Sequence, residues 1–84
     1  MVKQSIQINL ENGLEARPIA LLVQEASKYD SVIHIISGEK KVNAKSIMGM
    51  MSLVLGNGET LEVVAEGEDE AKAVEGLGKF LSGN

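Results

Sequence analysis

A tight turn in the middle of the chain constrains the fold more than any other feature. The dipeptide Gly38-Glu39 separates residues 32–36, which are rich in β-branched side chains, from residues 40–43. Two strands joined by so short a turn pair antiparallel. We therefore expect a hairpin here, and any further strand must be joined to it by its own connection.

The segments on either side of this hairpin alternate between strand and helix patterns. Residues 5–10 and 60–66 have apolar side chains at every second position, which is typical of half-buried strands. Other segments repeat apolar residues at helical spacing. These are residues 18 to 28 or 29, with Pro18 in the first turn, residues 44–53 and residues 69–81. We expect the order βαββαβα: an α/β protein of the α+β type, one domain over residues 1–84, with helices on one face of a four-stranded antiparallel sheet.

Charge and composition exclude several kinds of partner. The 84 residues include 8 basic and 12 acidic side chains and no cysteine, and the net charge is −4 at pH 7. Lys40, Lys41 and Lys45 form the only basic cluster. A nucleic-acid binder needs a larger basic face. The longest apolar run, residues 19–23, is too short to cross a membrane. We therefore expect a cytoplasmic protein that contacts neither nucleic acid nor membrane directly.

The chain offers little for catalysis or metal binding. His34 is the single histidine, lies within an expected strand and has no acidic or histidine neighbour two positions away. A position on the sheet surface is the simpler interpretation. The acidic run from Glu66 to Glu70 lacks the spacing of a calcium loop and fits the charge preference of a helix start. We expect no enzyme activity, no metal and no cofactor.

One segment with chemical potential is Gly13-Leu14-Glu15-Ala16-Arg17-Pro18. It places Arg17 among the free N–H groups of a helix start, an arrangement that binds anions. The alternative is that Glu15 is only a capping acid and Arg17 only a surface cation. Arg17 is also well placed to pair with Glu15.

The other such segment is residues 43–51, Asn-Ala-Lys-Ser-Ile-Met-Gly-Met-Met. A short helix cannot bury Ile47, Met48 and Met51 against one sheet face. Exposed methionines are common on adaptable binding surfaces, so these side chains indicate a docking patch. The alternative is a core helix in which methionine fills gaps. Ser46, at or near the helix start, is a preferred N-cap residue.

The two segments, in this order and at this chain length, resemble the HPr family of phosphocarrier proteins of the sugar phosphotransferase system. The resemblance runs from Val2 to about Phe80. Its most specific parts are residues 42–49, Val-Asn-Ala-Lys-Ser-Ile-Met-Gly, and residues 65–70, Ala-Glu-Gly-Glu-Asp-Glu. It implies an open-faced β-sandwich in which three helices cover four antiparallel strands.

One position departs from the family motif Gly-x-His-Ala-Arg-Pro. The family histidine accepts phosphate from phosphoenolpyruvate through Enzyme I, and Glu15 stands in its place here. The resemblance therefore does not imply a carrier. The pattern is similar to the Crh group, HPr paralogues of bacilli that lack the histidine, typically have glutamine there and keep the serine. Glu15 either mimics a phosphorylated histidine or marks a simple loss of function.

The resemblance also implies a role for the serine. Ser46 would be phosphorylated with ATP by HPr kinase/phosphorylase, and the phosphorylated chain would act as corepressor of the LacI-type repressor CcpA. The partner-binding residues implied are Glu15, Arg17, Ala20, Ile47, Met48 and Met51. Two alternatives stay open: a phosphocarrier with phosphate on another residue, for which His34 is the only imidazole, or a direct regulator of a metabolic enzyme.

Overall fold

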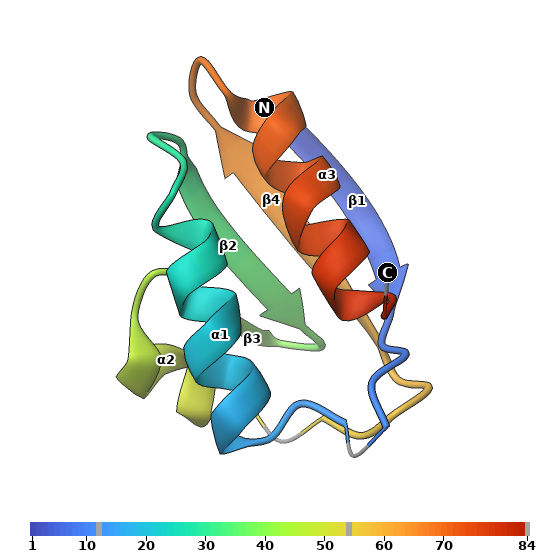
Figure 1. Ribbon diagram of the computed structural model, residues 1–84. Helices are drawn as coiled ribbons and strands as arrows, with labels where there is room; N and C mark the ends of the chain where they lie inside the picture. The colour runs from blue at the N-terminus through green and yellow to red at the C-terminus, as the bar shows by residue number, and fades with distance from the viewer. Residues whose placement is uncertain (12, 54, 84) are drawn as a thin grey trace.

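The computed structural model describes residues 1–11, 13–53 and 55–83, which form one sheet and three helices (Figure 1). The strands are β1 (Val2–Gln7), β2 (Val32–Ser37), β3 (Lys40–Asn43) and β4 (Thr60–Glu66). The helices are α1 (Ala16–Ala26), α2 (Ile47–Met51) and α3 (Glu70–Leu81). The predicted βαββαβα order is confirmed.

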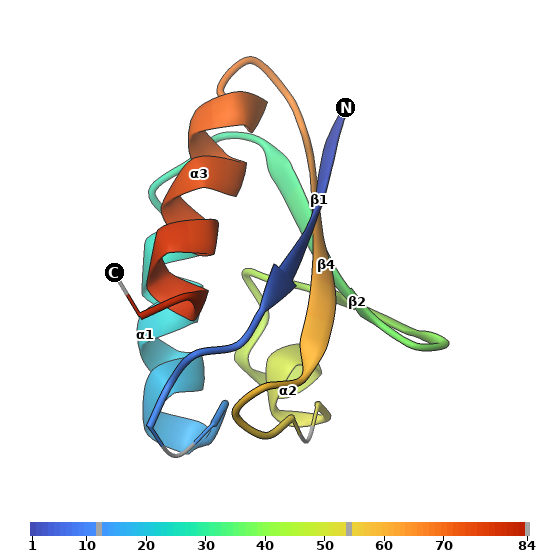
Figure 2. The ribbon, with the colours of Figure 1, turned by 90° about the vertical axis from the view of Figure 1, so that its right-hand side faces the viewer.

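The sheet has the strand order β1-β4-β2-β3, and all neighbouring strands are antiparallel. Ile6 of β1 lies opposite Leu61 of β4, and Ile35 of β2 lies opposite Val63. Because side chains alternate across a strand, this register brings the apolar positions of neighbouring strands to the same face. Figure 2 shows the sheet close to edge-on, with α1 and α3 on that face and the other face open. This is the predicted open-faced sandwich.

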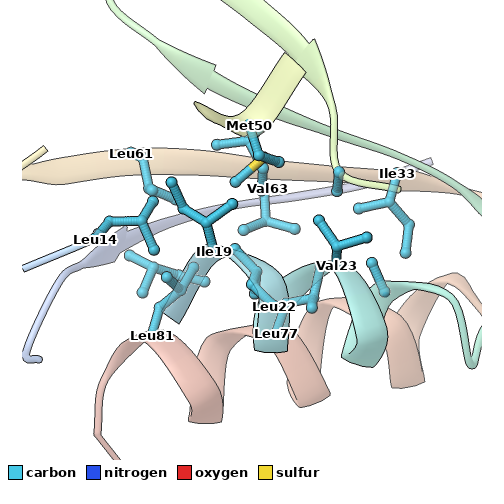
Figure 3. Packing of buried hydrophobic residues seen from close by; sticks show 14 of the residues in the cluster. Leu14, Ile19, Leu22, Val23, Ile33, Met50, Leu61, Val63, Leu77 and Leu81 are labelled. Atoms are coloured by element: carbon cyan, nitrogen blue, oxygen red, sulfur yellow. The ribbon is translucent and has the colours of Figure 1, made fainter. Parts of the chain in front are cut away.

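The core fills the space between the sheet and the helices (Figure 3). Leu22 of α1, Leu77 of α3 and Met50 of α2 are fully buried, together with the inward side chains of the strands. Each helix therefore contributes apolar side chains to a single aliphatic cluster. The fully buried Met50 is what holds the short α2 against the rest of the molecule.

Strand β1 begins and ends earlier than the sequence pattern predicts. We expected residues 5–10, whereas pairing with β4 starts at Val2. The strand ends at Gln7, although the N–H of Ile8 still donates to the carbonyl of Glu59 at 2.8 Å; the N–H of Asn9 then donates to the carbonyl of Leu81 at the end of α3, also at 2.8 Å. Ile8 still packs in the core, so the alternation continues past the strand itself.

The helices are shorter or shifted relative to expectation. Helix α1 begins at Ala16, with Pro18 in its first turn, and ends at Ala26 because the next turns tighten: the N–H of Tyr29 donates to the carbonyl of Ala26. Helix α2 was expected over residues 44–53 and spans only five residues. Helix α3 starts one residue late, with Asp69 as its N-cap. The expected ranges of β3 and β4 are confirmed, and β2 extends one residue further, to Ser37.

Candidate functional site

Ser46 is the N-cap residue of α2. Its backbone is extended, with φ −106° and ψ 114°, and its Oγ accepts a hydrogen bond from the N–H of Gly49 at 3.1 Å. This side chain thereby satisfies one of the N–H groups that a helix start leaves without a partner. The hydroxyl proton remains available for donation to another group, because in this bond the oxygen is the acceptor.

The loop before Ser46 is held by hydrogen bonds at each backbone N–H. The N–H of Ala44 donates to the carbonyl of Ile33 at 2.9 Å, and that of Lys45 donates to Oδ1 of Asn43 at 2.8 Å. The N–H of Ser46 donates to the carbonyl of Asn43 at 3.0 Å. These bonds form a turn that takes the place of the first helical turn we expected from Ala44 onward.

Helix α2 turns three large apolar side chains to solvent. Ile47 is 49% exposed, Met48 87% and Met51 54%, whereas Met50 is buried. These three side chains therefore place exposed apolar groups on one short helix. The alternative of a core helix in which methionine fills gaps is correct for Met50 alone. The predicted exposure of Ile47, Met48 and Met51 is confirmed.

Helix α1 lies beside α2, so its first turns border this patch (Figure 1). Ala20 is half-buried, and Arg17 is exposed. Leu21, which the sequence reasoning did not single out, is also exposed, at 47%. Helical periodicity places Leu21 outside the buried stripe of Ile19, Leu22, Val23 and Ala26 and could have indicated its exposure. We call Ala20, Ile47, Met48 and Met51 the docking patch.

Glu15 is the N-cap residue of α1 but does not cap with its side chain. Its backbone is extended, its side chain is exposed, and it accepts no cap hydrogen bond. The interpretation of Glu15 as a capping acid is therefore wrong. The Arg17 side chain forms no ion pair or hydrogen bond with any residue the structure describes, so the expected pairing with Glu15 is not found either.

The start of α1 is fixed by backbone contacts. The N–H of Leu14 donates to the carbonyl of Leu55 at 2.9 Å. Gly13, at φ +74°, allows this approach, since a Cβ there would lie 2.8 Å from the same carbonyl oxygen. Glu15 and Arg17 thus project from a rigid helix start whose remaining N–H groups favour a negative charge.

Two lysines of the expected basic cluster bind carbonyl groups within the chain. Lys40 Nζ donates to the carbonyl of Ser52, just beyond α2, at 2.8 Å, and Lys45 Nζ donates to the carbonyl of Tyr29, beyond α1, at 2.6 Å. Sequence reasoning missed both contacts. The Tyr29 contact joins residues 16 positions apart and leaves no local pattern to find.

The remaining candidates lie elsewhere. His34 is half-buried in β2, where Asn43 and Val64 face it across the sheet. It belongs to the open face, whereas Glu15 and Ser46 lie at helix starts. Within the described ranges, no three acidic, histidine or cysteine side chains gather to hold a metal ion. None of the described helices has the length and apolarity needed to cross a membrane.

The fold and the motifs at the two helix starts define a class of small phosphotransferase-system protein. Residues 2–83 match the family described as PTS HPr component phosphorylation site, and the chain belongs to the HPr family.

Within that family, the chain is similar to proteins called HPr-like protein Crh. It is 51% identical to that of Halalkalibacterium halodurans over 96% of both chains. It is 47% identical to that of Bacillus subtilis, over 96% of this chain and 95% of the relative. The crystal structure of a phosphocarrier protein HPr from Bacillus anthracis str. Ames superposes with a TM-score of 0.92 at 46% identity, with 95% of each chain covered.

Proposed function

We propose that this chain is a regulatory member of the HPr family that acts in carbon catabolite repression in the cytoplasm. In this proposal HPr kinase/phosphorylase phosphorylates Ser46, and the phosphorylated form binds the LacI-type repressor CcpA as its corepressor. The observation that carries the proposal is the pairing of a helix-capping Ser46 hydroxyl with three exposed apolar side chains on the same five-residue helix. The similarity to Crh proteins supports a regulatory role.

The chemical step is a phosphoryl transfer from ATP. The Oγ of Ser46 attacks the γ-phosphorus, the bond from that phosphorus to the β,γ-bridging oxygen breaks, and ADP leaves. The hydroxyl proton passes to a base of the kinase. The Oγ accepts a hydrogen bond from the N–H of Gly49 on the half-exposed Ser46, and a Cβ at position 49 would lie 3.4 Å from this oxygen.

Phosphorylation changes the surface more than the fold. It adds about −1.5 to −2 charges and three acceptor oxygens beside the docking patch. A negative group at a helix start is compatible with the helix dipole, so α2 need not rearrange. A partner arginine would read the phosphate while an apolar groove receives Met48 and Met51. The same charge would repel an acidic partner, so a single modification changes which protein binds.

The side chain at position 15 argues against a phosphocarrier. A carrier of this family uses an imidazole at this position, and Glu15 offers only a carboxylate. His34 is the single imidazole, and it lies on the open face of the sheet rather than at the anion-favouring start of α1. The function is therefore binding rather than catalysis, with no cofactor.

The test is phosphorylation by HPr kinase/phosphorylase and ATP, followed by peptide mass spectrometry. We expect one phosphate, at Ser46, and none on Ser46→Ala. Ser52→Ala is the matched control, since Ser52 lies at the other end of the same helix, with its Oγ on the carbonyl of Gly49. Phosphate on Ser27, Ser31 or Ser52 would contradict the proposal. An acid-labile phosphoprotein formed with phosphoenolpyruvate and Enzyme I would instead favour the carrier.

A further inference from the structure

The loop that carries Ser46 is tied to a distant part of the chain by one lysine. Lys45 is half-buried, and its ammonium donates to the carbonyl of Tyr29 at 2.6 Å. Tyr29 follows the carboxyl end of α1, where carbonyl groups lack helical partners and a cation is favoured. The contact gives the Tyr29 carbonyl a hydrogen-bond donor, and it holds Lys45, the residue next to Ser46, against the end of α1.

The Tyr29 side chain, next to the carbonyl that Lys45 binds, contacts two helices. The Tyr29 hydroxyl donates to Oε2 of Glu25 at 2.9 Å. The same hydroxyl lies against Gly76 of α3, where a Cβ would come within 2.1 Å of it. Tyr29 is therefore held by α1 and α3 together, and Lys45 transmits that position to the Ser46 loop.

We propose that Lys45 is a positioning residue for phosphorylation of Ser46: it holds the Asn43–Ser46 loop so that the serine hydroxyl meets the γ-phosphorus of ATP in line. This inference rests on the proposed function, because it concerns the same phosphorylation. In this proposal the Lys45 ammonium stabilises the conformation of the loop that carries Ser46. The kinase does not contact Lys45 directly.

The geometry distinguishes Lys45 from its basic neighbour. Lys41 is exposed on β3, and its side chain has neither an ion pair nor a hydrogen bond within the described part of the chain. Lys41 has the same charge as Lys45 and lies four residues before it, but its side chain does not connect the loop to another element. Substitution of either lysine by methionine removes one positive charge, but only the change at Lys45 releases the loop.

Loss of positioning has a kinetic signature. A nucleophile displaced by about 1 Å can cost about 100-fold in rate. Release of the tether lets the loop sample other geometries while the docking patch stays intact. We therefore expect Lys45→Met to lower kcat for phosphorylation about tenfold with little change in KM, the pattern of an interaction that matters only in the transition state.

The experiment compares Lys45→Met, Lys45→Arg and Lys41→Met as substrates of HPr kinase/phosphorylase, with melting temperatures measured for each. Lys45→Arg should recover most of the rate, since a guanidinium also donates to a carbonyl. Lys41→Met should match the parent. If the parent chain is not phosphorylated at all, the proposed function fails. If the parent is phosphorylated and Lys45→Met is equally fast, only this inference fails.

Hydrogen exchange on the kinase-free protein separates positioning from direct recognition. We expect Lys45→Met to speed exchange of the Ser46 and Gly49 amides and to leave core amides such as that of Val63 unchanged. A slower phosphorylation with unaltered exchange at Ser46 and Gly49 would mean that the kinase contacts Lys45 itself, and would overturn the proposal.

Discussion

Glu15 stands at a helix start that is built to receive negative charge but makes no use of its own carboxylate there. Its side chain is exposed and forms no cap bond, while Gly13 and the Leu14–Leu55 contact hold the backbone in place. A different side chain at position 15 should therefore leave the fold intact. This separates the question of chemistry at position 15 from the question of folding.

Substitution of Glu15 by histidine should restore at least partial phosphoryl acceptance from Enzyme I. The substitution supplies the missing nucleophilic nitrogen, and exposed Arg17 with the helix start would stabilise the phosphate. A radiolabel transfer assay from phosphoenolpyruvate measures this, with the parent chain as blank. If folded Glu15→His stays unlabelled, the surface that meets Enzyme I has changed at further positions.

Loss of the Ser46 cap should also be measurable without any kinase. Ser46→Ala removes the acceptor for the Gly49 N–H, so we expect the free energy of unfolding to fall by about 1 kcal/mol. Ser46→Asp keeps an acceptor at the helix start and should stay near the parent value. Chemical denaturation monitored by circular dichroism compares the two. Equal losses in both variants would mean that the cap does not stabilise α2.

At the scale of elements, α2 divides its methionines between core and surface. Met48→Asp should weaken binding to the kinase and to the repressor and leave the melting temperature nearly unchanged, because the side chain is 87% exposed. In the bound state an unpaired carboxylate would be buried in an apolar contact, which costs on the order of several kcal/mol. Met50→Ala is the contrasting variant: its side chain is fully buried, and we expect a loss of about 2–5 kcal/mol in stability. A large drop in melting temperature for Met48→Asp would refute the docking patch.

Two turns at one end of the molecule are joined through Asp69. Its carboxylate accepts hydrogen bonds from the Ser31 hydroxyl and from the backbone N–H groups of Asp30 and Ser31. The Ser31 hydroxyl, followed by the Asp30 N–H, holds the pKa of Asp69 below its ordinary value. A lowered pKa means that the stabilisation is complete above the unfolded-state pKa of about 3.9 and is lost as the pH falls through the folded-state value.

Asp69→Asn should therefore melt at a lower temperature than the parent at pH 7. The difference should shrink as the pH falls from about 4 through the lower pKa of the folded carboxylate, where the folded parent takes up a proton. Melting curves of both proteins between neutral and strongly acid pH measure this. Glu25 and Glu70 also have lowered pKa values, but both proteins keep them, so the comparison isolates Asp69. Parallel stability curves would contradict the role of this contact.

The sequence was most informative where local pattern and tertiary structure agree. The short turn at Gly38-Glu39 and the alternation in β4 predicted those strands to within a residue. The length of α2 was not predictable from local pattern. The Ala44 N–H donates to the carbonyl of Ile33 in β2, a contact between distant parts of the sequence, and the helix begins only after it. The exposure of Ile47, Met48 and Met51 was predictable, because a short helix cannot bury all three side chains against one sheet face. The Lys45–Tyr29 contact could not be foreseen, since nothing in the local sequence marks it.

At the scale of the whole molecule, the fold leaves large apolar side chains of α2 exposed at one end. The core joins all three helices to one face of the sheet, so α2 is anchored through Met50 while its outer side remains uncovered. Ser46 lies at the edge of that uncovered surface. A phosphate there would add charge to a surface that is otherwise apolar, which in the proposed function is the physical basis for a change of partner.

The most direct test is a calorimetric titration of the CcpA repressor with this chain in its Ser46-phosphorylated and unphosphorylated forms. We predict that the phosphorylated form binds at least tenfold more tightly, which corresponds to about 1.4 kcal/mol or more. The phosphorylated Met48→Asp variant should lose most of that gain. Equal affinity of the two forms, or no binding by either, would contradict the account.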